Sequence, residues 1–193
     1  VVKIGDWPEK AKNPFGEIVE ILGKTESNDA EMKSILLSNG IPIDFPEEVM
    51  NEANRINLAL AQDEIKNRRD FRDVLPFTID PVDAKDIDDA LSIEYLKNGN
   101  IEVGIHIADV GHYVTPHSAL DKEALLRGNS VYMVDRVIPM LPEHLSNGVC
   151  SLRPNEEKFT FSAVFELNDK AEIQNEWFGK TAILSDRRFA YED

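Results

Sequence analysis

The stretch Thr78-Ile-Asp-Pro-Val-Asp-Ala-Lys-Asp-Ile-Asp-Asp-Ala90 holds five aspartates set among apolar residues. The run from Leu75 to Ile79 predicts a short buried strand. Pro81 is expected to end this strand, because proline cannot donate a hydrogen bond to a neighbouring strand. Asp80 is therefore expected at the end of a strand, and the aspartates that follow are expected on an irregular segment.

Three more carboxylates come close behind, at Asp86, Asp88 and Asp89. Carboxylates so near one another repel unless a cation neutralises them. Mg²⁺ binds carboxylate oxygens and keeps coordination positions open for water and for a substrate phosphate. A carboxylate cage of this kind serves metal-assisted phosphodiester hydrolysis, in which the cation activates water and stabilises the leaving oxygen.

An acidic run can also belong to other kinds of site, and each kind requires a particular sequence pattern. A solvated acidic turn is the simplest, but apolar strands on both sides would bury the base of the cluster. A calcium-binding loop needs a third aspartate and then glycine, whereas counting from Asp86 gives Asp88 and then Ala90 and Leu91. An aspartate-rich diphosphate site needs a helix, which Pro81 and the preceding strand disfavour.

Alternating apolar residues predict further strands after the aspartates. Ala90–Leu96 and Ile101–Val110 flank a turn at Lys97–Asn100 that is typical of a hairpin. Alternation returns over Phe159–Leu167, and the chain then turns back into Ala171–Ile183. We therefore expect an α+β fold, built on a mixed, mostly antiparallel sheet with helices.

Three segments have the pattern of helices. Asn28 and Glu31 are the expected capping pair of the first, which ends at Gly40. The second opens at Pro46 and is expected to continue to about Arg69, and the third spans Ser118–Arg127. The residues expected to face inward are Ile35 and Leu36 in the first helix, Val49, Ala53, Ile56 and Leu60 in the second, and Leu120, Ala124 and Leu125 in the third.

Some basic side chains have two possible roles. Arg68, Arg69 and Arg72 could contact phosphates, although arginines at a helix end more often satisfy carbonyl groups and the helix dipole. His106 lies on the strand face opposite its apolar neighbours. We expect it to be hydrogen-bonded within the fold rather than to bind a metal, because Mg²⁺ has little affinity for imidazole.

Composition limits the classes of function. The formal net charge of −15 has the wrong sign for a protein that grips phosphate backbones. Apolar residues make up 42% of the chain, enough for a core, but no apolar run approaches the length that spans a membrane, so no membrane partner is expected. The lone Cys150 precludes an internal disulfide and fits a reducing compartment, which predicts a cytoplasmic protein.

Four further motifs follow the aspartates in order. They are Gly104-Ile-His-Ile-Ala-Asp-Val110, Ser130-Val-Tyr-Met-Val134, Ile138-Pro-Met-Leu-Pro142 and Leu145-Ser-Asn-Gly-Val-Cys-Ser-Leu-Arg-Pro154. Together with the aspartates, these motifs resemble the ribonuclease II / ribonuclease R family of exoribonucleases with its RNB catalytic domain, and within it the bacterial ribonuclease R members. The likeness runs from about Arg72 to the C-terminus and, more weakly, over residues 1–23.

The resemblance implies a Mg²⁺-dependent, processive hydrolysis of single-stranded RNA from its 3′ end to nucleoside 5′-monophosphates, with Mn²⁺ as a possible substitute cation. The family's catalytic aspartates fall on Asp80, Asp86, Asp88 and Asp89. Asp80, Asp86 and Asp89 would bind the metal, and Asp88 would position the attacking water or assist its deprotonation. Tyr132 would stack on the terminal bases, whereas its residue type and place alone favour a core tyrosine on a strand.

The resemblance also implies three parts: residues 1–23 as the closing strands of a cold-shock or OB-type barrel, residues 24–70 as a helical connector, and residues 71–193 as the N-terminal part of the RNB catalytic domain. The chain is thus expected to be a fragment of a monomeric parent, with weak or no activity of its own and with the basic RNA channel in segments it lacks. Two more functions stay open: a non-catalytic RNA-binding fragment, and a divalent-metal phosphoesterase acting on another ester.

Overall fold

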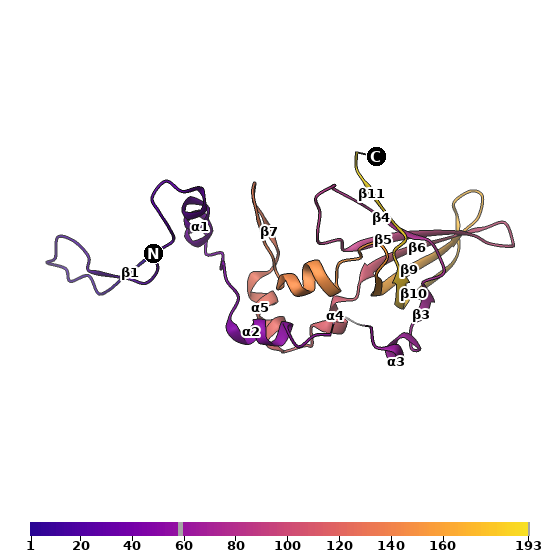
Figure 1. Ribbon diagram of the computed structural model, residues 1–193, viewed down its shortest axis with the longest axis horizontal. Coiled ribbons are helices and arrows are strands. Elements are labelled where there is room, and N and C mark those ends of the chain that lie inside the picture. Colours follow the sequence, from indigo (N-terminus) through magenta and orange to yellow (C-terminus); the bar gives the residue numbers. More distant parts are fainter. Residues whose placement is uncertain (58–59, 193) are drawn as a thin grey trace. The chain divides into compact units, whose positions relative to one another are not determined.

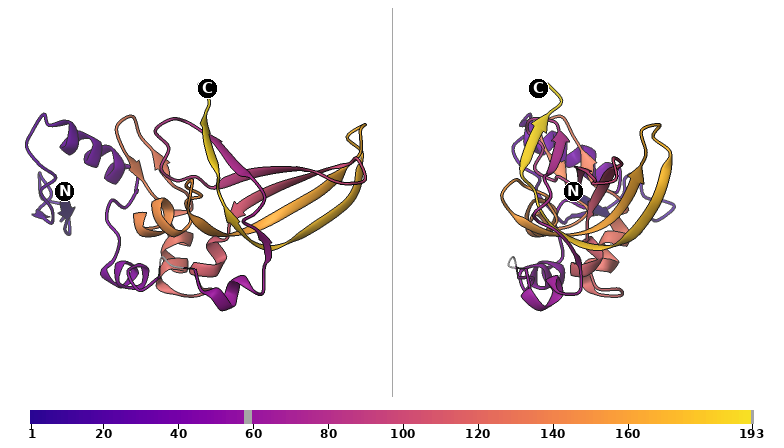
Figure 2. Two further views of the ribbon diagram at one scale, coloured as in Figure 1. Left: turned by 45° about the vertical axis from the view of Figure 1, so that its right-hand side comes forward. Right: turned by 90° about the vertical axis from the view of Figure 1, so that its right-hand side faces the viewer.

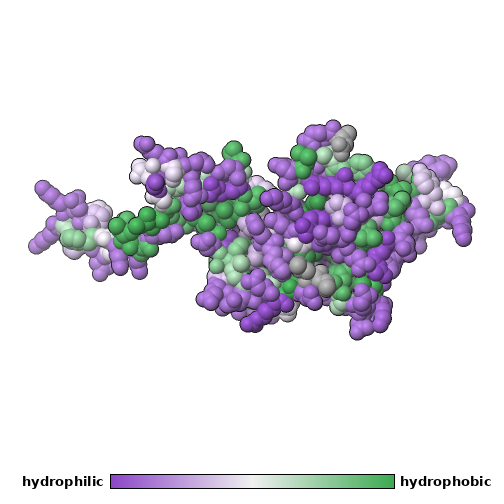
Figure 3. Space-filling model, in the orientation of Figure 1, coloured by the Kyte–Doolittle hydropathy of each residue, from purple (hydrophilic) through white to green (hydrophobic). Residues whose placement is uncertain are grey.

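The computed structural model describes residues 1–57 and 60–192, and the chain divides into two compact units, Val1–Phe45 and Pro46–Asp193. The division into residues 1–23, 24–70 and 71–193 stays a prediction. Among the described residues, no helix is long and apolar enough to cross a membrane. Hydrophilic residues dominate the face drawn in Figure 3, as the acidic composition predicts.

The N-terminal unit begins with a small hairpin. Strand β1 (Val2–Ile4) pairs antiparallel with β2 (Gly16–Ile18), within the segments where barrel strands are predicted. The side chains of Trp7 and Phe15 are 58% and 73% exposed, so neither belongs to a core within this unit. A sheet of two strands buries too little apolar surface to be stable alone.

Helix α1 (Asn28–Ser38) follows the hairpin, and its start differs from the prediction. Ser27 is the N-cap, because its backbone is extended and its Oγ accepts a hydrogen bond from the Ala30 backbone N–H at 3.3 Å. Asn28 is therefore the first helical residue. Leu36 is buried as predicted, whereas Ile35 is 49% exposed and does not face inward. Gly40 follows the helix with a positive φ of 71°, as the prediction requires.

The prediction of one long second helix from Pro46 to Arg69 is wrong. Residues 58–59 of this segment lie outside the described residues. In the described part, the structure has two short helices instead, α2 (Glu47–Ala53) and α3 (Gln62–Ile65), followed by strand β3 (Arg69–Phe71). Val49 and Ala53 are buried, so the helical spacing is correct over the first two turns. Arg69–Phe71 does not continue a helix, because it joins the sheet as β3 by pairing in parallel with Thr181–Ile183.

The second unit is built on one seven-stranded sheet, with strand order β11-β4-β5-β6-β9-β10-β3. The two edge strands pair in parallel with their neighbours, and all the pairs between them are antiparallel, which confirms the predicted α+β class with a mixed sheet. Figures 1 and 2 show the β5–β6 and β9–β10 hairpins extending together toward one end of this unit. The strands not yet given bounds are β4 (Pro76–Asp80), β5 (Asp89–Tyr95), β6 (Ile101–Ala108), β9 (Glu157–Leu167), β10 (Ile173–Leu184) and β11 (Arg187–Ala190).

Short elements connect β6 to β9: α4 (Val110–Tyr113), α5 (Ala119–Arg127), the hairpin of β7 (Val131–Tyr132) and β8 (Val137–Ile138), and the π-helix η1 (Leu145–Val149). In α5, Leu120 is buried as predicted, but Leu125 is 84% exposed. The inward position is taken by Glu123, whose carboxylate lies 2.8 Å from the Arg127 guanidinium. A charged pair on the buried side therefore displaces an apolar residue to the surface.

His106 lies in a row of buried polar side chains on one face of the sheet. One ring nitrogen lies 2.9 Å from Ser92 Oγ and the second lies 2.7 Å from Ser162 Oγ, so a neutral imidazole satisfies both as donor and acceptor. The predicted role within the fold is confirmed. Burial, reinforced by the positive charge of Arg69, lowers the pKa of His106 to about 4.

This pKa predicts an acid-sensitive fold. Because the native state disfavours the charged ring, stability is complete above the unfolded pKa of 6.5 and falls as the pH drops from there toward 4. Each unit of pKa difference is about 1.4 kcal/mol, so His106 alone accounts for a loss of roughly 3 kcal/mol. Urea titrations between pH 7 and pH 4 are expected to show this loss in the wild type and a shallower one in His106→Gln; parallel curves would contradict it.

The arginines near β3 bind carboxylates of the fold. The side chain of Arg68 is fully buried and lies 2.8 Å from Asp109 and 2.9 Å from Glu64. Arg69 forms an ion pair with Glu102, and Arg72 forms ion pairs with Asp70 and Glu157. The three arginines therefore have a structural role, but not at a helix end as predicted, because α3 ends before them and their partners are mainly carboxylates.

Candidate active site at the end of β4

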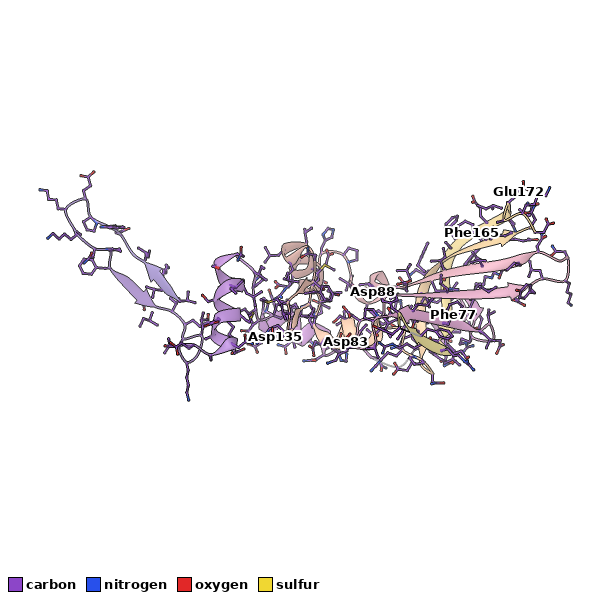
Figure 4. All side chains as sticks on the ribbon, turned by 90° about the horizontal axis from the view of Figure 1, so that it is seen from above. Phe77, Asp83, Asp88, Asp135, Phe165 and Glu172 are labelled. Carbon is purple, nitrogen blue, oxygen red and sulfur yellow. The ribbon has the colours of Figure 1, made fainter. Side chains whose placement is uncertain are left out.

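The sheet brings two of the aspartates to the same end of neighbouring strands. Asp80 is the last residue of β4, and Asp89 is the first residue of β5, its antiparallel neighbour. Asp89 thus belongs to a strand and not to the predicted irregular segment. Asp86 and Asp88 lie on the loop between the strands, and Figure 4 shows Asp88 at one end of the sheet and Glu172 near the opposite end.

The four carboxylates act on one another electrostatically. Burial raises the pKa of Asp80, and the negative charges of Asp89 and Asp86 raise it further. Asp88 is an exposed residue, and partial desolvation of its carboxylate still raises its pKa, with the charges of Asp86, Asp89 and Asp80 as additional causes in that order. The four aspartates therefore form a set of mutually repelling charges, and a cation would stabilise such an environment.

The loop that carries Asp86 and Asp88 is fixed by a distant segment. Ile87 between them is 1% exposed, and its backbone N–H donates to Ser151 Oγ at 3.2 Å. The Leu152 N–H donates to the Ile87 carbonyl at 2.8 Å, and Ser151 Oγ donates to the Lys85 carbonyl at 2.7 Å. The loop start is held separately, because the Arg188 guanidinium donates to the carbonyl groups of residues 81 and 82 at 2.7 and 3.0 Å.

Tyr132 reaches the aspartates from the β7–β8 hairpin. Its hydroxyl donates a hydrogen bond to Asp86 Oδ2, while its side chain is 65% exposed. Both residues line a cavity of about 580 Å³, together with Arg136, Glu143 and Asn147. The structure therefore places Tyr132 beside the Asp86 carboxylate with an accessible ring. Tyr132 does lie on a strand, β7, but the alternative of a core residue is wrong.

The hydrogen bond between Tyr132 and Asp86 predicts a measurable change in titration. A carboxylate that accepts from a phenol stabilises the protonated phenol, and this bond, followed by burial, raises the pKa of Tyr132 to about 12. The ultraviolet difference titration of wild type against Tyr132→Phe is expected to show this midpoint. In an Asp86→Asn background the same difference should return toward the ordinary value of about 10. A midpoint near 10 in the wild type would contradict the interaction.

The side chains suit a divalent cation in their chemistry. Asp80 Oδ2 is buried and has no hydrogen-bond partner in the described part of the chain, and the three remaining carboxylates interact with it or with one another electrostatically. Within residues 1–57 and 60–192, however, no three His, Cys, Asp or Glu side chains converge on a point where they could hold a metal ion. Oxygen ligands of the kind that Mg²⁺ prefers thus lie at the ends of β4 and β5 and on the loop between them, but in the described residues they do not converge into a three-ligand metal site.

Ser151, Leu152 and Arg188 support the site, and sequence analysis does not identify them as site residues. Ser151 and Leu152 lie in the motif Leu145–Pro154, which contributes to the family resemblance without any role being assigned to it. Their hydrogen bonds to the aspartate loop join positions more than sixty residues apart, as in the pair Ile87 and Ser151 with a separation of 64. No local pattern reports contacts over such a distance.

Comparison with known proteins agrees with this geometry. The RNB domain matches residues 68–193, and a cold shock domain matches residues 1–46. The chain belongs to the RNB domain family. The resemblance drawn from the motifs is thus confirmed, and the cold-shock match extends beyond the residues 1–23 that sequence analysis assigns to such a barrel.

Its relatives include ribonucleases from bacteria. The chain is 42% identical to Ribonuclease R 1 of Lactococcus lactis over 99% of its own length and 24% of that protein. It is also 42% identical to Ribonuclease R of Thermotoga maritima, over all of its length and 27% of that protein. The chain therefore spans about a quarter of the length of these curated relatives.

Solved structures with the same fold include both a ribonuclease and a pseudonuclease. Mycoplasma genitalium RNase R in complex with double-stranded RNA superposes with a TM-score of 0.89 and 28% identity, over 99% of this chain and 34% of that chain. Yeast Ssd1, described as a pseudonuclease, superposes with a TM-score of 0.77 and 26% identity, over 99% of this chain and 24% of that one.

Proposed function

We propose that this chain carries the metal-binding carboxylates of a Mg²⁺-dependent, processive 3′→5′ exoribonuclease that releases nucleoside 5′-monophosphates from single-stranded RNA. The observation that carries the proposal is the meeting of Asp80 and Asp89 at one sheet end, with Asp86 and Asp88 on the loop between them. The family and the RNA-bound relatives support it, since the matched Mycoplasma RNase R structures hold double-stranded RNA and ribose-methylated single-stranded RNA.

In this mechanism each carboxylate has one role. Asp80, Asp86 and Asp89 would hold the cation once it brings their carboxylates together, and the cation would supply Lewis acidity and charge neutralisation at the scissile phosphate. Asp88 orients the attacking water and accepts its proton, and the raised pKa of Asp88 brings it closer to the range in which a general base works well. The exposed ring of Tyr132 stacks on the terminal base, a contact worth about 1–3 kcal/mol for any base.

We also propose that residues 1–193 alone turn RNA over weakly. The curated relatives are about four times longer, so their active sites can draw on groups that have no counterpart in this span. The net charge of −15 adds a second reason, because binding to a phosphate backbone relies on basic residues. A cytoplasmic location is proposed with it, since the one cysteine, Cys150, is a buried free thiol. A monomeric parent is proposed on the family resemblance alone.

A second function is favoured by one observation. Yeast Ssd1 shares this fold at a TM-score of 0.77, so the architecture also occurs in a protein described as a pseudonuclease. Here the chain would bind RNA without turnover. A third function, hydrolysis of another phosphate ester, would use the same carboxylates on a different substrate.

Incubation of 3′-labelled single-stranded RNA with the full-length protein separates these functions. Stepwise release of mononucleotides with Mg²⁺, lost on chelation by EDTA and restored by Mg²⁺ or Mn²⁺, is expected for the exoribonuclease. RNA binding that is independent of metal and without product would favour the binding function. Hydrolysis of a small phosphodiester with intact RNA would favour the third and contradict the first.

A further inference from the structure

Ser151 joins the two sides of the aspartate loop through a single buried hydroxyl. Its oxygen accepts from the Ile87 N–H at 3.2 Å and donates to the Lys85 carbonyl at 2.7 Å, and the residue is 0% exposed. Asp86 lies between these two backbone groups, and Asp88 follows directly after them. One side chain therefore fixes the backbone on both sides of Asp86.

The segment that presents Ser151 is rigidly held. Val149, Cys150 and Leu152 around it are almost fully buried. The Lys158 ammonium from β9 donates to the Gly148 carbonyl at 2.7 Å, and so ties the segment to the central sheet. Because the Ser151 hydroxyl is anchored to the sheet in this way, it holds the loop backbone at a fixed position relative to the sheet.

We propose that Ser151 is a positioning residue for the carboxylates of Asp86 and Asp88, setting the distance between them through the backbone of Lys85–Ile87. The proposal rests on the proposed function for its catalytic consequence, but its structural part is independent of that function. Ser151 touches neither substrate nor metal in this scheme. It acts through the loop, and small displacements of reacting groups are costly, with about a hundredfold loss of rate for an error near 1 Å.

The test uses the full-length protein and three variants. Ser151→Ala removes the hydroxyl, and Ser151→Thr restores it. Ser185→Ala is the matched control, because Ser185 is also 0% exposed and its hydroxyl has no hydrogen-bond partner among the described residues. Residue-resolved hydrogen exchange at the Ile87 amide, the apparent Kd for Mn²⁺, and kcat and KM on 3′-labelled RNA are measured for each.

Ser151→Ala is expected to accelerate exchange of the Ile87 amide by about tenfold or more, since a buried N–H loses its partner. Mn²⁺ binding should weaken about tenfold, and kcat should fall by roughly ten- to a hundredfold with KM for RNA within about twofold. Ser185→Ala should leave all these quantities unchanged even if its Tm falls. Ser151→Thr should recover most of the protection and of kcat.

Two results would overturn the proposal. The first is a folded Ser151→Ala protein in which the Ile87 amide stays protected and Mn²⁺ binds as before. The second, which applies if Ser151→Ala does not fold, is a folded Ser151→Cys protein with wild-type exchange and Mn²⁺ affinity, because sulfur is a weak hydrogen-bonding group. A third outcome separates the two proposals. If the wild type releases no mononucleotides, while Ser151→Ala still shows the expected changes in amide exchange and Mn²⁺ affinity, the proposed function is contradicted and the positioning role is supported.

Discussion

The substitution Asp88→Asn is expected to lower the rate of mononucleotide release by roughly 10²–10⁴-fold, the usual contribution of a positioned general base. The amide keeps the size and one acceptor oxygen of Asp88 but cannot take a proton from water. Because the three remaining aspartates are intact, RNA binding and metal affinity should change little. Single-turnover cleavage of 3′-labelled RNA, together with binding measured in Ca²⁺, separates the chemical step from binding.

Asp83→Asn is the matched control for this experiment. Asp83 lies in the same loop, is exposed, and matches none of the four catalytic positions of the family resemblance. Both substitutions remove one negative charge from the loop, so a purely electrostatic effect would appear in both. Equal losses of rate in the two variants would contradict the role of Asp88, as would an active Asp88→Asn protein.

Replacement of Arg68 by alanine is expected to destabilise the fold by about 3–5 kcal/mol, because it leaves a buried carboxylate without its main partner. The Arg68 guanidinium lies 2.8 Å from Asp109 and donates to the carbonyls of Thr160 and Thr181 at 3.3 and 3.4 Å. It also lies 4.1 Å from the centre of the Phe159 ring. After its loss, the nearest cation to Asp109 in the described part of the chain is the ammonium of Lys180, at 3.6 Å.

Urea or guanidinium denaturation measures this effect. In a double-mutant cycle, Arg68→Ala combined with Asp109→Ala should cost less than the sum of the single changes, because no unpaired charge then stays buried. The control Arg153→Ala breaks an exposed pair with Glu156 and should cost at most about 1 kcal/mol. A change of similar size for Arg68 and Arg153 would mean that the buried network contributes little.

The parts of the fold that sequence reasoning predicts well are those with local patterns. The strands β4, β5, β6, β9 and β10 combine apolar alternation with recognisable turns, and Gly99 in the β5–β6 turn has the positive φ of 89° that such a turn requires. The α+β class follows from these strands together with the predicted helices. Asp80 can be assigned to a strand end for the same reason, since Pro81 marks it in the sequence.

Predictions fail where long-range contacts override local preference. Arg69–Phe71 has no strand pattern of its own and becomes β3 by pairing with Thr181–Ile183, so local spacing extends a helix into it. Leu125 is predicted inside because hydropathy gives no sign of the buried Glu123–Arg127 pair. The aspartates are found through one contiguous motif, whereas Ser151 reaches the loop from a distant part of the chain.

Strand β10 is left with a long open side. Strand β3 covers only its end, at Thr181–Ile183, so Ile173–Lys180 has no outer neighbour among the described strands. An exposed edge of this kind can pair with an extended segment of another chain, which leads to aggregation. In this strand, the register shift between Ile173 and Asn175 distorts the regular spacing of the backbone N–H and C=O groups along the edge. The exposed charged side chains of Glu176 and Lys180 also keep the edge hydrated. These features are expected to keep the molecule from adding strands of neighbouring copies to its sheet.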